Sequence, residues 1–172
     1  MSVPCLLMSA HILIDMTANF IFKDTTLKFL TPEKALAIWD DIAPLFLRVV
    51  ERIDGGEFNL DDLRLMSASG EIIIGVARKN GEVTMALAFQ PVQYPRAKSV
   101  NVLAIAGKNL DQFIEAFLPP FQEFCRDEYD ADWIECVASA GAVRMYTRRG
   151  FRAVYQHLRI GTGKNYGRID SE

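Results

Sequence analysis

The sequence predicts a mixed α/β (α+β) domain, with a central sheet of about six to seven strands and helices on both faces. Three observations lead to this prediction. The chain has 172 residues, of which 50% are apolar and 24% charged, as is typical of a globular protein with a core. Stretches with the period of strands alternate with stretches of the helical period in the second half of the sequence. Two adjacent β-prone stretches in the middle predict a hairpin.

Residues 1–24 are interpreted as an N-terminal arm or strand ahead of the domain. They contain apolar runs, but no Lys or Arg occurs before Lys23, so the positive start of a secretory signal is missing. No apolar run in this part is long enough to cross a membrane. The sequence leaves open whether the natural start lies at Met16 instead.

The domain is expected to begin with a strand and a long helix. Residues 25–30 alternate and are β-prone, which predicts the strand. Thr31 is a suitable N-cap, Pro32 fits the first helical position, and Glu33 suits the positive end of the helix dipole. Apolar residues then recur every three or four positions, so the helix is expected to continue to about Ile53.

A short helix and three strands are predicted next. Asn59 and Asp62 have the spacing of a capping box, which indicates the start of the helix. The dipeptide Asn80-Gly81 lies between two β-prone stretches and is a strong signal for a tight hairpin turn. Residues 100–106 are almost all apolar, as expected for a central strand that is buried on both faces.

A helix with an interruption is predicted after this strand. Asn109 and Gln112 again have capping-box spacing, and an apolar stripe follows them. Pro119 and Pro120 interrupt the stripe and are expected to kink or split the helix, because proline removes a backbone donor. Residues 133–138 then read as a further strand.

The last predicted elements are a helix over residues 140–149 and a strand over residues 151–160. Gly150 lies between them and suits the left-handed conformation in which helices often end. Residues 161–172 are polar and contain glycine, so a flexible tail is expected there. The domain itself is therefore expected to span residues 25–160.

A short motif near the C-terminus resembles the helix signature of the GCN5-related N-acetyltransferase (GNAT) superfamily. Four residues are in register with it: Ala142, Tyr146, Gly150 and Phe151. Ser139 occupies the position where the family often has Asn. The predicted order of strands and helices is also similar to that of GNAT proteins, so the resemblance covers roughly residues 25–160.

The resemblance implies an acyl-CoA-dependent N-acyltransferase, with acetyl-CoA or CoA as the cofactor and an unknown amine as the acceptor. It implies a V-shaped opening between the strand that ends near Ala106 and the strand through Glu135, covered by the segment that bears Tyr146. Tyr146 would protonate the departing thiolate. The pantetheine arm of the acyl-CoA would pair with the edge of the strand that ends near Ala106. The implied cofactor-binding residues are Leu103, Ala104, Ile105, Ala106, Gly107, Lys108, Asn109, Ser139, Ala142 and Tyr146.

The phosphate-binding loop departs from the family pattern. GNAT enzymes carry Gln/Arg-x-x-Gly-x-Gly/Ala there, and the loop amides and the helix N-terminus hold the pyrophosphate. This chain has only Gly107 and Lys108 in that stretch, and Asp111 is expected to repel a phosphate. Two interpretations stay open. Either the amides of Gly107, Lys108 and Asn109 bind an anion, or the stretch is a plain turn with Lys108 in solvent.

A proton acceptor for the amine is sought among polar residues on the strands. Glu135 is the preferred candidate because its strand borders the expected opening and it lies between the apolar neighbours Trp133 and Cys136. Cys136 should face the opposite side of that strand. The alternative for Glu135 is an edge charge in solvent. The other candidates are Glu71, Glu82 and Asn101.

A second function class is a catalytically inactive GNAT-like protein with a structural or binding role. Some divergent GNAT-like proteins resemble small internal virion proteins of podoviruses, so a phage virion-associated or assembly protein is one example. Residues 1–22 would then be a docking segment. The first function class implies an acyl-CoA and an amine as partners, and the second implies a virion partner. A homodimer is compatible with both. The expected location is accordingly the cytoplasm or a virion.

Composition argues against two other classes. The formal net charge is −3, whereas a protein that relies on phosphate contacts to nucleic acid is usually basic. Three cysteines and two histidines, widely spaced, offer too little for a metal site or a disulfide framework. Reduced thiols, no metal and no nucleic-acid partner are therefore expected.

Overall fold

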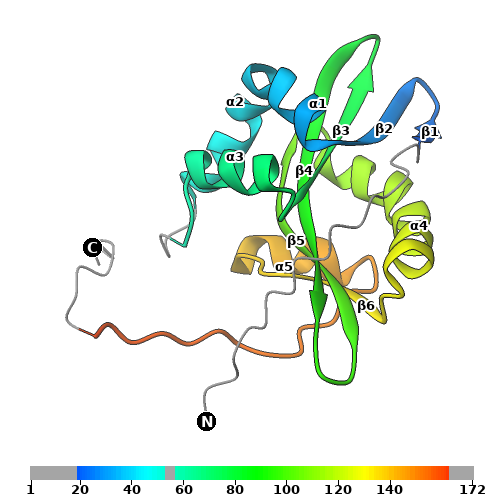
Figure 1. Ribbon diagram of the computed structural model, residues 1–172. Coiled ribbons are helices and arrows are strands. Elements are labelled where there is room, and N and C mark those ends of the chain that lie inside the picture. Colours follow the sequence, from blue (N-terminus) through cyan, green and yellow to red (C-terminus); the bar gives the residue numbers. More distant parts are fainter. Residues whose placement is uncertain (1–18, 53–56, 163–172) are drawn as a thin grey trace.

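The computed structural model describes residues 19–52 and 57–162. Within these ranges the strands form one six-stranded sheet in which they lie side by side in chain order (Figure 1). The first five strands are antiparallel to their neighbours, whereas the sixth is parallel to the fifth. This mixed sheet confirms the predicted fold class. The strands are β1 (Asn19–Phe22), β2 (Thr25–Leu30), β3 (Ile73–Lys79), β4 (Glu82–Gln93), β5 (Lys98–Gly107) and β6 (Trp133–Cys136).

The predicted arm and tail fall largely outside the described part of the chain. β1 occupies the end of the region 1–24, and Met16 lies among residues that the structure does not describe. The same holds for residues 163–172 of the predicted tail.

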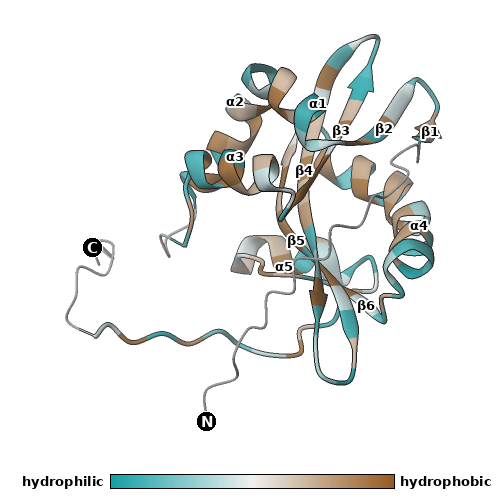
Figure 2. Ribbon diagram, viewed as in Figure 1, coloured by the Kyte–Doolittle hydropathy of each residue, from teal (hydrophilic) through white to brown (hydrophobic). Residues whose placement is uncertain are grey.

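Helices cover both faces of the sheet, and each face has its own apolar cluster. On the α4 face, Phe29 and Phe89 of the sheet meet Phe121 and Phe124 of the helix, with ring centroids 4.6 to 5.9 Å apart. The other cluster joins the sheet to Trp39, Ile42, Phe46 and Leu63. Figure 2 shows apolar residues beside polar ones along α2 and α4. The helices are α1 (Pro32–Ala37), α2 (Trp39–Val50), α3 (Leu60–Ser69), α4 (Leu110–Tyr129) and α5 (Ala140–Thr147).

Local signals at helix starts and at the hairpin are confirmed. The Thr31 hydroxyl accepts a hydrogen bond from the backbone N–H three positions on, at 3.4 Å. Asn59 and Asp62 form the predicted capping box, with reciprocal hydrogen bonds of 2.8 and 2.9 Å. Asn80 and Gly81 both have positive φ, 51° and 83°, as a tight turn between β3 and β4 requires.

The predicted long helix is divided into two. Ile38 has φ −115° and ψ 19°, which are not helical values, so α1 ends before it and α2 begins after it. α2 ends at Val50, and Ile53 lies outside the described residues. The periodic pattern did not reveal this break, because both helices bury residues against the same face of the sheet.

α4 differs from its prediction in two ways. It runs continuously through Pro119 and Pro120. Pro119 is exposed and Pro120 half-buried, and the aromatic contacts hold the helix on the sheet although the two prolines lack a backbone donor. The predicted capping box with Gln112 is absent, because Asn109 adopts a left-handed conformation (φ 54°) and its side chain makes no cap bond.

The predicted last strand over residues 151–160 is not formed. The segment leaves α5 and runs away from the sheet (Figure 1), so it has no strand to pair with. Figure 2 shows apolar and polar residues alternating along it, which explains the prediction. Four of its large apolar side chains are 70% to 93% exposed: Val154, Tyr155, Leu158 and Ile160.

Candidate active site

β5 and β6 form a fork. They pair in parallel only from Ser99 opposite Trp133 to Val102 opposite Cys136. β6 ends there, whereas β5 continues to Gly107 along β4. In the described part of the chain, the edge of β5 that faces away from β4 therefore has no strand partner beyond Val102. This is the V-shaped opening that the resemblance implied.

A β-bulge lies at the point where the fork opens. Ala88 of β4 pairs with Ala104, but the next residue pairs with Val102, so Leu103 has no partner on β4. Leu103 and Ala104 consequently both pack on the α2 side, while Val102 and Ile105 pack on the α4 side. A bulge interrupts the pairing with the neighbouring strand and bends the strand, and here it lies at the point where the β5–β6 pairing ends.

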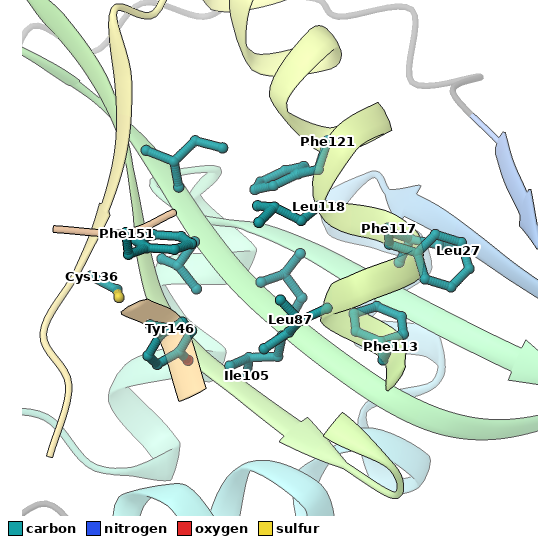
Figure 3. A pocket seen from close by; sticks show the side chains of 13 residues that line it. Leu27, Leu87, Ile105, Phe113, Phe117, Leu118, Phe121, Cys136, Tyr146 and Phe151 are labelled. Carbon is teal, nitrogen blue, oxygen red and sulfur yellow. The ribbon is translucent and has the colours of Figure 1, made fainter. Parts of the chain in front are cut away.

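A cavity of about 50 Å³ lies on the α4 side of the fork (Figure 3). The hydroxyl of Tyr146, carried by α5, points toward Ile105 on β5 in this view. The Tyr146 ring packs edge-on against Phe151, with centroids 5.3 Å apart. The cavity is lined by Leu27, Leu87, Val102, Ile105, Phe113, Ile114, Phe117, Leu118, Phe121, Ile134, Cys136, Tyr146 and Phe151.

The two polar groups of this lining are both kept neutral by their surroundings. Burial raises the pKa of Tyr146 to about 12, and the nearby Cys136 adds to the effect. Burial likewise raises the pKa of the Cys136 thiol, as does the charge of Glu135. Tyr146 therefore keeps its proton at neutral pH and is able to donate a hydrogen bond.

Glu135 lies on β6 one residue before the fork opens, opposite Asn101. Because side chains alternate along a strand, it faces the side away from Cys136 and Tyr146, as the sequence indicated. Its two carboxylate oxygens accept hydrogen bonds from the Tyr94 hydroxyl and the Trp133 indole, each at 2.7 Å. The structure thus places the two predicted catalytic residues on opposite faces of the sheet.

The loop after β5 is fixed by close backbone contact. Gly107 has φ 149°, and a Cβ there would meet the Met85 Cα at 2.8 Å, so only glycine fits. The Lys108 amide donates to the Thr84 carbonyl at 3.2 Å and is engaged in this contact. Asn109 follows in a left-handed conformation, and its carbonyl accepts from the Phe113 amide at 3.0 Å.

The pairing of Arg149 with Asp111 is a feature of the site that the sequence did not reveal. The Arg149 guanidinium forms an ion pair with Asp111 at 2.9 Å, and also donates to the Asp111 carbonyl at 3.2 Å. The Arg149 side chain is only 14% exposed, and Glu115 lies 3.6 Å away. The positive charge compensates Asp111, whose repulsion of a phosphate was expected from the sequence. No local pattern links two residues this far apart along the chain.

The remaining predicted residues lie at the start of α5. Ser139 is the exposed N-cap of α5; its carbonyl accepts from the Ala142 and Val143 amides at 2.9 and 3.1 Å, but its hydroxyl makes no cap bond. Ala142 is half-buried one turn before Tyr146. Cofactor candidates on β5 and on α5 are thus brought to the two sides of the fork.

Solved structures match this arrangement, whereas no protein-family model and no curated protein sequence matches the chain. A ribosomal-protein-alanine N-acetyltransferase from Brucella melitensis biovar Abortus 2308 gives a TM-score of 0.63 at 13% identity, covering 81% of this chain and 99% of the other. The aminoglycoside acetyltransferase HMB0005 from an uncultured soil metagenomic sample gives 0.60 at 17% identity, covering 80% and 97%. The chain has a GNAT-like fold. At these identities the likeness shows the fold alone.

Two further observations concern the described part of this GNAT-like chain. Within residues 19–52 and 57–162, no three His, Cys, Asp or Glu side chains gather in a way that would hold a metal ion. None of the helices described is both long enough and apolar enough to span a membrane.

Proposed function

We propose that this protein is an acyl-CoA-dependent N-acyltransferase. The observation that carries the proposal is the fork between β5 and β6, which opens at a β-bulge near the half-buried Tyr146. A thioester-transfer site needs two features. One is a set of backbone groups that have no strand partner, and the other is a neutral proton donor. GNAT-fold acetyltransferases, the structural neighbours of the chain, supply the precedent for this use of the fold.

In this proposal the acyl-CoA, such as acetyl-CoA, binds along β5. The amides of the pantetheine arm pair with the free edge from Leu103 to Ala106, as an added strand does. The diphosphate lies near Gly107, Lys108 and Asn109, where the start of α4 offers free amides and Arg149 compensates Asp111. Ser139 and Ala142 contact the donor from the other side of the fork.

The transfer step is a direct displacement. The nitrogen lone pair of a neutral amine attacks the thioester carbonyl carbon, so that a C–N bond forms and the C–S bond breaks. Backbone amides near Ala104–Ala106 stabilise the oxyanion. Tyr146 protonates the departing thiolate and regains its proton from water. Glu135, on the face of the sheet opposite Tyr146, takes the proton that the amine loses.

Binding and turnover can be tested separately. Thermal shift with CoA and acetyl-CoA should show stabilisation of about 2.7 kcal/mol at a hundredfold excess over the dissociation constant. Release of the CoA thiol would then be followed with a peptide bearing N-terminal alanine and with an aminoglycoside, the acceptors named for two structural neighbours. No shift at millimolar CoA would refute the proposed donor site.

A Tyr146→Phe variant tests the acid role. We expect kcat to fall by roughly 10²-fold or more, while CoA affinity stays within about twofold, because the hydroxyl acts on the leaving group. Unchanged turnover would show that another group protonates the thiolate. Retained binding of CoA would show that the variant is folded.

A structural or binding role without catalysis is the second candidate. The exposed apolar side chains of residues 151–160 favour it, because four large side chains in one short segment offer a surface for a partner. The partner would be a second copy of the chain or a component of a virion. Under this proposal CoA produces no thermal shift, and the docking segment proposed for residues 1–22 contributes to assembly.

A further inference from the structure

The cavity beside Tyr146 is more apolar than a pantetheine site should be. Thirteen side chains line it, and only Tyr146 and Cys136 carry polar atoms. Amide groups placed inside it would lose hydrogen bonds to water with almost nothing to replace them, which costs roughly 2 kcal/mol or more for each group. The amides of a pantetheine arm belong at the backbone edge of β5 instead.

We propose that this cavity holds the hydrocarbon chain of the acyl group, and that the donor carries about three to five carbons beyond the thioester carbonyl. The inference rests on the proposed function and adds the class of acyl group that the site accepts.

The position of the cavity supports this assignment. Val102 and Ile105 come from one arm of the fork, and Ile134 and Cys136 from the other, so the cavity lies against the opening itself. Tyr146, which the proposed function puts at the thioester sulfur, is also part of the cavity wall (Figure 3). A chain that leaves the carbonyl on the α4 side therefore enters the cavity directly.

The volume sets the length of the chain. A site for one water molecule needs roughly 10–15 Å³ measured in this way, so a volume of about 50 Å³ accepts about three to five groups of that size. A methylene group is close to a water molecule in size. Butyryl to hexanoyl groups fit this range, whereas the single methyl group of acetyl would leave most of the cavity empty. Unfilled space beside apolar walls forfeits dispersion contacts.

Residues from α4 close the far side of the cavity. Ile114, Leu118 and Phe121 reach it from successive turns of the helix. Since α4 is held on the sheet by aromatic contacts, this wall is firmly placed and limits the chain length. Acyl chains longer than hexanoyl should therefore bind little more tightly than hexanoyl does.

Calorimetric titration with CoA, acetyl-CoA, butyryl-CoA, hexanoyl-CoA and decanoyl-CoA tests the inference. Each methylene that enters the cavity should tighten binding by about fourfold, so butyryl-CoA is expected to bind about 15-fold more tightly than acetyl-CoA. The gain should continue to hexanoyl-CoA and stop before decanoyl-CoA. If CoA and all the acyl-CoAs bind with equal affinity, the assignment of the cavity to the acyl chain is refuted, whereas the donor site itself is supported. No binding of any of them would overturn the donor site itself.

Three variants test whether this cavity is the source of the chain-length preference. Leu118→Trp fills the cavity from α4 and should abolish the preference for hexanoyl-CoA over acetyl-CoA. Gln122→Trp places the same residue on the exposed side of the same helix and should keep the preference. Leu118→Ala enlarges the cavity and should move the optimum to longer chains, which provides a second test if the tryptophan is poorly accommodated. A preference that survives both Leu118 variants would refute the location.

Discussion

Replacement of Gly107 by alanine probes how firmly the chain is held at the open end of the fork. Gly107 has a φ of 149°, which side chains with a Cβ rarely adopt. An added Cβ would meet the Met85 Cα at 2.8 Å and would lie even closer to the Thr84 carbonyl oxygen and the Met85 sulfur. Two of these atoms belong to the β4 backbone, so they yield only if β4 and β5 move apart.

The expected cost follows from these contacts. The strained backbone costs about 1–2 kcal/mol. Separation of the strands also weakens the hydrogen bond from the Lys108 amide to the Thr84 carbonyl, which is 3.2 Å long, at a further cost of about 0.5–1.5 kcal/mol. The steric overlap of the added Cβ with β4 adds to these two costs. We therefore expect the free energy of unfolding to fall by about 3 kcal/mol or more.

Urea unfolding followed by circular dichroism measures this change. Gly141→Ala is the matched control, because Gly141 lies in α5 with open space around it and no unusual φ. There alanine should raise the free energy of unfolding by about 0.5–1 kcal/mol, since it is the better helix former. A Gly107→Ala variant within about 0.5 kcal/mol of the parent protein would refute the tight approach of β5 to β4.

Two other predictions concern Arg149 and Tyr146. Arg149→Met removes the partner of Asp111 and should lower the free energy of unfolding by about 1 kcal/mol in the same urea assay, because the largely buried guanidinium also donates to the Asp111 carbonyl, whereas the Asp111 side chain is 64% exposed and water screens the ion pair. Arg148→Met, at an exposed neighbour, should stay within about 0.5 kcal/mol, and equal effects of the two would contradict the pairing. Burial raises the pKa of Tyr146 from 10.0 to about 12, so the unfolded chain loses this proton first and stability should fall as pH rises from about 10 to 12. The urea midpoint of Tyr146→Phe should fall less steeply with pH over that range than the midpoint of the parent protein. Parallel curves of midpoint against pH for the two proteins would contradict the raised pKa of Tyr146.

Local sequence signals predicted the parts of the fold that depend on neighbouring residues. The Thr31 cap, the Asn59–Asp62 capping box and the turn at Asn80 each rest on a side chain or a φ value within a few positions, and all are present. The motif around Tyr146 was also read correctly as a helix that ends before Phe151.

Features that depend on distant partners were not predictable in the same way. Residues 151–160 have the alternation of a strand, but a strand forms only beside another strand, and the chain leads this segment away from the sheet. The bulge at Leu103 arises from the register between β4 and β5, which no single segment specifies. Likewise the contacts of Glu135 with Tyr94 and of Arg149 with Asp111 join residues far apart in the sequence.

Hydrogen exchange along β5, followed by NMR with and without CoA, is the sharpest test of the fork as a donor site. The amides of Leu103–Ala106 that face the opening should exchange faster than those paired with β4, because they have no strand partner in the described part of the chain. Saturating CoA should slow them by about tenfold or more, as pairing with the pantetheine arm protects them. Slow exchange of these amides without ligand, or bound CoA that leaves their rates unchanged, would contradict the fork as the place where the donor binds.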